Sequence, residues 1–403
     1  MGVTITAIKF NHDSSAATTD ALNLRRNATQ FVTVPEWQAG VSVNPEDSPA
    51  AYSINDTRGN TVTIQARFQT TDPVSVAEIR AVDPVVDPPG PSGCMGLIYK
   101  LIRALIRALS GNVLGDVKPA TVTFANGDTG FVTFQLQNLR LWDVGVGVRT
   151  TTWTWQYRVG GGPWTDIATT SHRIYSVLNV PTAPWQQAPY NAANTQLPWT
   201  EALDVACQWA VLAQDPVTAG TRVTERVFGL GPATFVYDCP GGGGSAYTDF
   251  HTTFYCTAFL DRMRGGPGLG EFVNCTDCAT FVSSFSNLLG CDLWQSKMGW
   301  GFDLNPLLAI GSNTWQTACG WGGFSYHEVA WTGACGAGDR VYDGCLEVDG
   351  DADPTGPPHT GLLPADMVFG VPGDGNYRSR LCPPSGQPNC APQPGEKRRR
   401  VIA

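Results

Sequence analysis

Ionisable side chains are scarce in this sequence, and their scarcity narrows the functions it can have. Only 15% of its 403 residues are charged, and the formal net charge is -9. Phosphate binding needs a basic face, so this balance argues against nucleic acid as the main partner. Histidine is also rare, which leaves few candidates for a general base. The five histidines are His12, His172, His251, His327 and His359.

Long apolar runs are missing as well. No stretch is long enough to span a bilayer, and the opening residues lack the basic start and apolar core of a secretory signal. Cysteine is the better guide to the compartment. Of 12 cysteines, only Cys94 lies in the first two hundred residues, and the rest fall between Cys207 and Cys390. This density predicts disulfides, and therefore favours an extracellular or other oxidising compartment.

Glycine, proline and tryptophan are abundant, with 45, 29 and 13 copies, which is typical of a protein rich in strands and turns. Apolar residues alternate with polar ones through much of the first half, and Asn126-Gly127 and glycine pairs supply turns. We therefore expect an antiparallel, Ig-like β-sandwich over residues 1–183. The expected strands are 31–34, 62–68, 76–82, 122–124, 131–134, 150–159 and 171–180.

Residues 95–109, MGLIYKLIRALIRAL, interrupt this pattern with an amphipathic helix after a proline-rich linker. Lys100, Arg103 and Arg107 lie on one side of it, with leucine and isoleucine on the rest. Such a helix can pack across the sandwich or between domains. It can also contact a membrane surface or a partner protein.

The second half is organised around residues 274–291, NCTDCATFVSSFSNLLGC. From Ala279 onward the apolar residues have the helical period, and the helix is predicted to end at Gly290. Cys275 then lies at or just before the helix N-terminus, where the positive end of the helix dipole stabilises a thiolate. Further helices are predicted at 199–213 and 221–228.

A nucleophilic thiol needs a base and a third group that orients the base. His327 begins the strand-like run HEVAW, and Asp343 lies in the next one, DRVYDGCLEV. Neighbouring strands can place both side chains on one face, which gives a triad in the order Cys275, His327, Asp343. Asp349 and Asp353 are alternatives for the third member.

Two other roles remain open for the thiols. Cys275 can be half of a disulfide, or it can form a metal site with Cys278 and later cysteines. Zinc sites usually present two close cysteine pairs, and the sequence has no second CxxC, so no metal or cofactor is expected. For the oxyanion, the amide of Cys275 is the first candidate donor, with the side chain of Trp199 or Gln208 as the second.

These motifs resemble the transglutaminase-like superfamily over about residues 195–355. The cysteine helix resembles the core motif of that family, HEVAW its histidine motif, and Asp343 falls where the family has its acid. The matching residues of the first motif are Cys275, Asp277, Ala279, Phe281, Leu289 and Gly290.

The resemblance implies an α+β, papain-like domain, which we place at 184–355. It also implies a catalytic triad in which Cys275 is the nucleophile, His327 the general base and acid, and Asp343 the orienting group. The implied activity is hydrolysis (cysteine protease, amidase or deamidase) or acyl transfer on amide bonds of a protein or peptide substrate. The alternative is a secreted structural or binding protein, stapled by disulfides, whose transglutaminase-like fold is degenerate.

Residues 356–403 are rich in proline and glycine and are expected to form a C-terminal tail. A disulfide between Cys382 and Cys390 would close a small loop there. The basic cluster KRRR, residues 397–400, is expected to be a solvated end.

Overall fold

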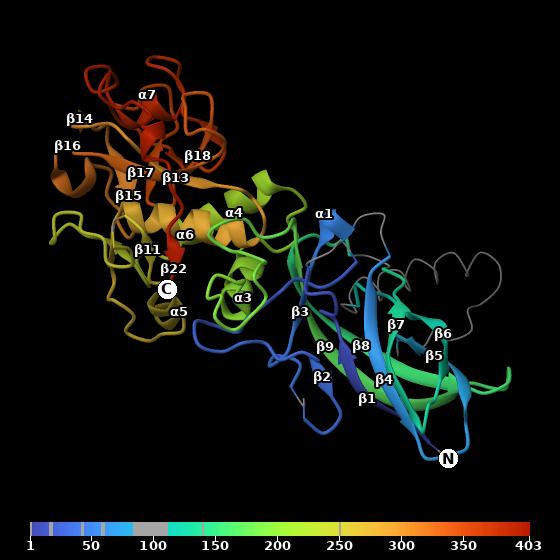
Figure 1. Cartoon of the computed structure of the whole chain (residues 1–403). Helices are drawn as coiled ribbons and strands as arrows, with labels where there is room; N and C mark the ends of the chain where they lie inside the picture. The colour runs from blue at the N-terminus through green and yellow to red at the C-terminus, as the bar shows by residue number, and fades with distance from the viewer. Residues whose placement is uncertain are drawn as a thin grey trace, which may run out of the picture. The chain divides into compact units, whose positions relative to one another are not determined.

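The computed structural model describes residues 2–15, 19–41, 44–57, 61–83, 112–138, 141–249 and 251–403. The helix predicted at 95–109 lies outside these residues. The chain divides into two compact units, one of residues 1–180 and 187–200, the other of residues 181–186 and 201–403 (Figure 1). None of the described helices is long and apolar enough to cross a membrane.

The first unit is a sandwich of two sheets. In the first sheet the order is β2 (Trp37–Gln38), β1 (Val3–Lys9), β4 (Thr63–Thr70) and β7 (Asp128–Gln135). In the second sheet the order is β3 (Ala50–Ser53), β9 (Thr165–Val177), β8 (Gly147–Arg158), β5 (Val76–Val82) and β6 (Val117–Thr123). All pairings are antiparallel except that of β3 with β9, and a short helix, α1 (Ile54–Thr57), follows β3.

Aromatic side chains join the inner faces of these sheets. The ring centres of Phe68 on β4 and Phe134 on β7 lie 5.4 and 5.9 Å from the ring centre of Trp155 on β8, in edge-to-face geometry. All three are fully buried. The alternation that predicts the strands therefore marks the side chains of this core, because successive residues of a strand face opposite sides of the sheet.

Three expectations for the first unit need correction. The strand predicted at 31–34 is absent, and only Phe31 forms an isolated bridge, to Arg25. The first strand is instead β1, where the sequence pattern was weak. The Asn126-Gly127 turn joins β6 and β7, but these strands belong to different sheets, so the turn carries the chain across the sandwich.

The second unit is built around α6 (Cys275–Leu288), every residue of which is buried. The helix packs against β17 (His327–Trp331) in a sheet of order β13 (Trp294–Met298), β17, β18 (Arg340–Tyr342) and β21 (Met367–Val368). α4 (Pro216–Phe228) also contacts α6, and the unit contains α3 (Thr200–Trp209) and α5 (Cys256–Met263). The prediction of an α+β protein with a β-sandwich first is confirmed.

Short strands complete the second unit. The pairs are β10 (Val236–Tyr237) with β12 (Phe272–Val273), β11 (Thr253–Phe254) with β22 (Val401–Ile402), and β14 (Phe302–Asp303) with β16 (Gly323–Phe324). A three-stranded sheet has the order β15 (Leu307–Ala309), β19 (Leu346–Asp349), β20 (Gly361–Leu362). Residues 356–403, expected to form a tail, belong to this unit and carry β20, β21, α7 (Tyr377–Leu381) and β22.

The described cysteines form one disulfide, between Cys239 and Cys319. The remaining nine described cysteines are buried, and Cys275 is one of the free thiols among them. The nine include Cys382 and Cys390, for which a loop-closing disulfide was one possibility; their side chains form a hydrogen bond. The second unit is therefore stabilised mainly by the apolar core around α6, and not by many disulfides.

A buried carboxyl group in the first unit links the stability of the sandwich to pH. Glu36 is 4% exposed and accepts hydrogen bonds of 2.9 Å from the amides of Phe10 and Asn11. Burial raises the pKa of Glu36 to about 7, although these bonds oppose the shift, and the charge of Asp20 adds to it. The folded form therefore keeps a proton that the unfolded chain, with a pKa near 4.5, releases.

We expect Glu36 to lower the free energy of unfolding as pH rises from about 4.5 to about 7, because only the unfolded state loses the proton in that window. In Glu36→Gln this part of the pH dependence disappears. Thermal unfolding of both proteins across the window measures the difference. The matched control is Glu46→Gln, which changes an exposed carboxylate; parallel curves for the wild type and Glu36→Gln would contradict the prediction.

Candidate active site

The start of α6 is fixed by a reciprocal capping box. The Asn274 side chain accepts a 3.0 Å hydrogen bond from the Asp277 amide, and the Asp277 carboxylate accepts one from the Asn274 amide. Asp277 also accepts bonds from the amides of Ala246 and Tyr247 and from the Thr248 hydroxyl. Cys275 is therefore the first residue of the helix, held against the loop before α5. Its amide has no intrahelical acceptor, as is general for the first turn of a helix.

The structure brings His327 and Asp343 together, as the strand pattern predicts. His327 begins β17 and Asp343 directly follows β18; their Nε2 and Oδ2 atoms are 2.8 Å apart, with both side chains buried. The other ring nitrogen, Nδ1, is buried and has no hydrogen-bond partner of ordinary geometry among the described residues. It is therefore the nitrogen available to the thiol of Cys275, whose side chain interacts with the ring.

The environment of His327 favours the imidazolium form. Burial lowers the pKa of this histidine, but the charge and hydrogen bond of Asp343 and the interaction with Cys275 overcome burial and raise the pKa to about 10. A thiolate on Cys275 and an imidazolium on His327 would then stabilise each other.

Asp343 is held by three further donors. Its Oδ1 accepts from the amides of Cys345 and Leu346 at 2.9 and 3.2 Å, and its Oδ2 accepts from the Tyr377 hydroxyl at 2.8 Å. Tyr377 lies on α7, inside the segment expected to be a tail, and no motif in the sequence pointed to it. A fixed carboxylate keeps the imidazole in one tautomer and orientation.

The alternative acids lie elsewhere. Asp349 forms a 2.5 Å contact with His359, and Asp353 bonds to the amide and hydroxyl of Thr355. Neither contacts His327 among the described residues. Of the three aspartates proposed from sequence, the structure therefore places only Asp343 beside the histidine.

A cleft of about 410 Å³ leads to Cys275. Aromatic side chains and a glycine-rich loop form its walls, so it is a mixed polar and apolar surface. The lining residues are Tyr237, Cys239, Pro240, Gly242, Gly243, Cys275, Trp321, Gly323, Phe324, Ser325 and Tyr326.

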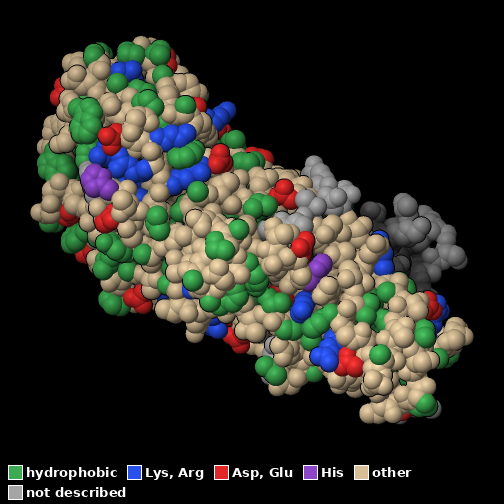
Figure 2. Space-filling view, in the orientation of Figure 1, with side chains coloured by type: hydrophobic (Ala, Val, Ile, Leu, Met, Phe, Trp, Pro, Cys, Tyr) green, Lys and Arg blue, Asp and Glu red, His purple; other side chains and the backbone are tan. Residues whose placement is uncertain are grey.

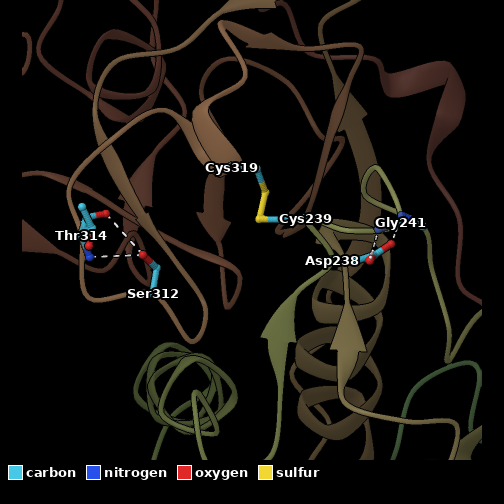
Figure 3. The surroundings of a disulfide bond; sticks show 7 residues. Asp238, Cys239, Gly241, Ser312, Thr314 and Cys319 are labelled. Atoms are coloured by element: carbon cyan, nitrogen blue, oxygen red, sulfur yellow. Dashed lines mark hydrogen bonds between the residues drawn. A yellow bond between two sulfur atoms is a disulfide. The ribbon is translucent and has the colours of Figure 1, made fainter.

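A disulfide joins Cys239, which lines this cleft, to Cys319; Figure 3 shows the bond and its surroundings. Cys239 follows β10, and Cys319 lies in η1 (Ala318–Gly320), two residues before Trp321. The Asp238 carboxylate accepts hydrogen bonds from the amides of Gly241 and Gly244, which orders the glycine-rich loop. The loop CPGGGGS, which reads as a surface loop in the sequence, is thus a fixed wall of the cleft.

Tyr237 is a candidate oxyanion donor that sequence reasoning missed. Its side chain lines the cleft, with its ring centre 6.2 Å from that of Trp321 and 6.3 Å from that of Phe324. Burial, followed by the nearby Cys275, raises the pKa of Tyr237 well above its ordinary value, so the hydroxyl keeps its proton. The two side chains named from sequence lie elsewhere: Gln208 is exposed on α3, and Trp199 donates to the Thr195 carbonyl in the first unit.

A buried ion pair joins the helix and the strand beneath the cleft. Arg400, just before β22, lies 2.8 Å from Glu328, the neighbour of His327. Glu328 also accepts a 3.1 Å hydrogen bond from Thr276, the neighbour of Cys275. Both charged side chains are fully buried, so the KRRR cluster is not simply the solvated end expected from its composition.

Metal binding finds no support in the described part of the chain. No group of three or more histidine, cysteine, aspartate or glutamate side chains there is placed to hold an ion. Cys278, the partner of Cys275 in the CxxC motif, instead hydrogen-bonds to Cys345, and burial raises its pKa. The two thiols of the motif therefore have different surroundings.

Comparison with known proteins gives little beyond a distant likeness. No protein-family description matches the sequence, and no curated protein matches it. Among solved structures, red sea bream transglutaminase is similar to the chain with a TM-score of 0.34 and 9% identity, over 80% of this chain and 50% of that one. The chain thus matches about half the length of that transglutaminase, and the likeness concerns the fold alone.

We expect Arg400→Met to lower the free energy of unfolding of the second unit by about 3–5 kcal/mol, because the buried Glu328 carboxylate loses its countercharge. Adding Glu328→Gln should restore at least half of that loss, since no buried charge then remains unpaired. Chemical denaturation of both variants measures this. Additive losses in the double variant would contradict a direct coupling of the two side chains.

Proposed function

We propose that the protein is a cysteine enzyme of the transglutaminase-like class, which acts on amide bonds of proteins or peptides through a thioester on Cys275. The observation that carries the proposal is the assembly of Cys275, His327 and Asp343 at the base of an open cleft. Cys275 is a free thiol, which favours this reading over a disulfide-stapled structural protein.

The arrangement accounts for each proton in the first half of the reaction. The Cys275 thiolate, whose proton is already on Nδ1 of His327, attacks the carbonyl carbon of the amide. The negative charge that forms on the oxygen is stabilised by the Cys275 amide and the Tyr237 hydroxyl. The imidazolium then gives its proton to the departing amine as the carbon–nitrogen bond breaks, leaving the thioester.

Asp343 works by holding the imidazole and stabilising its charged form. Its bonds to Tyr377 and to two backbone amides keep it fixed while the histidine gains and loses the proton. The thioester is released by an acceptor in the cleft: water gives hydrolysis, and a primary amine gives transamidation. Product analysis with and without an added amine separates these two outcomes.

Alkylation of the native protein tests the proposal. We expect iodoacetamide to modify Cys275 rapidly at about pH 6, where ordinary thiols are protonated and slow. His327→Ala should slow the reaction by about tenfold or more, because the thiolate loses its countercharge. Mass spectrometry of the modified cysteine measures both rates. The proposed enzyme function would be contradicted if Cys275 stayed unmodified, or if it reacted as fast in His327→Ala as in the wild type.

The pH dependence of the alkylation tests the role of Asp343. With the pKa of His327 at about 10, the imidazolium lasts through the neutral and mildly alkaline range. In Asp343→Asn we expect the pKa of His327 to fall, so less of the thiolate–imidazolium pair forms near pH 6 and the alkylation of Cys275 at that pH slows. Asp353→Asn, which alters an exposed acid, is the control and should keep the wild-type profile.

Tyr237→Phe tests the oxyanion donor. A bond made only in the transition state lowers kcat when it is lost, so we expect kcat to fall by about a hundredfold with KM little changed. Tyr255→Phe, which changes an exposed tyrosine, is the control. A rise in KM with unchanged kcat would show that Tyr237 only shapes the cleft wall.

A further inference from the structure

The second unit carries a basic surface although the chain as a whole has a net charge of -9. We define the basic surface as His251, Lys397, Arg398 and Arg399. Lys397 and Arg399 lie over the Trp294 ring, and Arg398 lies 3.5 Å from His251. Figure 2 shows Lys and Arg side chains gathered beside a histidine on this unit. Two acids lie among them: Glu396 pairs with Arg398 and Lys297, and Asp292 pairs with Arg399.

The cations are held in place before any partner arrives. The Lys397 ammonium and the Arg399 guanidinium lie 3.9 and 3.7 Å from the centre of the Trp294 ring. Lys397 also donates a 2.7 Å hydrogen bond to the Gly333 carbonyl. Binding to side chains that are already ordered costs less conformational entropy than binding to mobile ones. The basic surface is therefore organised for recognition.

Lys297, whose side chain is only 5% exposed, lies between the basic surface and the edge of the Cys275 cleft. The Lys297 ammonium lies 4.7 Å from the ring centre of Tyr326, which lines the cleft, and 5.6 Å from that of Trp300. Trp300 is 57% exposed, an unusual position for a large aromatic side chain. The turn that carries it is tied to the cleft wall, because the Gly301 amide donates to the Ser325 carbonyl. A peptide that leaves the cleft on this side meets Trp300 and then the cations.

The charge pattern fits a peptide better than a polyanion. Glu396 and Asp292 pair with two of the cations, so a dense row of phosphates would be repelled at these two positions. The net charge of the whole chain also disfavours an anionic lipid surface or RNA. A segment with a few spaced carboxylates can contact the cations and avoid the two acids.

We propose that the basic surface binds an acidic segment of the protein substrate, next to the residue whose carbonyl group acylates Cys275. This inference rests on the proposed function, because it assigns a substrate class to the same cleft. Trp300 contacts the substrate between the cleft and the cations. The contribution is electrostatic, so it acts mainly on substrate binding and weakens with salt.

Two measurements test the inference. Three fluorescent peptides share one glutamine-containing core. The first carries a run of glutamates before the core, the second carries the run after the core, and the third carries serines on both sides. Anisotropy with Cys275→Ser protein should show tighter binding of one acidic peptide, and the advantage should shrink between about 0.02 and 0.3 M salt. Equal binding of acidic and serine peptides, or tighter binding of a single-stranded RNA or of anionic vesicles, would overturn the inference.

Variants locate the effect. In Lys397→Gln/Arg398→Gln we expect the preference for the acidic peptide, measured as a ratio of kcat/KM values, to fall about fivefold through KM. Arg226→Gln, an exposed basic residue of α4 outside the basic surface, should keep the ratio. A ratio that is the same in the wild type and the double variant contradicts the inference.

The outcomes separate the two proposals. If Cys275 is rapidly alkylated and the protein turns over acidic and serine peptides equally, the substrate assignment is wrong but the proposed enzyme function is supported. If the acidic peptide binds but Cys275 is neither reactive nor acylated by any peptide, the enzyme fails, and the substrate assignment fails with it.

Discussion

The position of Cys275 depends on one carboxylate at the start of α6. Asp277 is fully buried and accepts hydrogen bonds from Asn274 and from the segment 246–248. Burial raises the pKa of Asp277 to about 6, against the effect of those same bonds. Because Asn274 also donates to the Gly243 carbonyl, a single network sets the first turn of the helix and the wall of the cleft. The thiol is thereby fixed relative to both.

Buried carboxylates held by several hydrogen-bond donors also fix the strand side of the site. Asp343 is fixed by four donors, and Glu328 is fixed by Arg400 and Thr276. Each buried acid is costly alone and favourable only in its complete set of bonds. The geometry between helix and sheet is therefore set by polar networks, within an otherwise apolar core around α6.

Sequence patterns found the parts of this arrangement that are local. The period of α6, the strand at HEVAW and the spacing to Asp343 were readable because each depends on a few neighbouring residues. Asn274 and Asp277 also carry a local signal, the N-x-x-D capping pattern, which would have set the helix start at Cys275. Tyr237 and Tyr377 have no such signal, because only the folded chain brings them near Cys275 and Asp343. The sheet order of β6 and β7 was missed for the same reason.

The buried Arg400 has a consequence for how the protein is made. Arg400 completes the network under the cleft, and β22 beside it pairs with β11, far earlier in the chain. During translation, α6 and β17 leave the ribosome well before these last contacts exist. A nascent chain therefore holds Glu328 without its Arg400 countercharge until β22 has been synthesised, so the network under the cleft forms only after synthesis has passed residue 402.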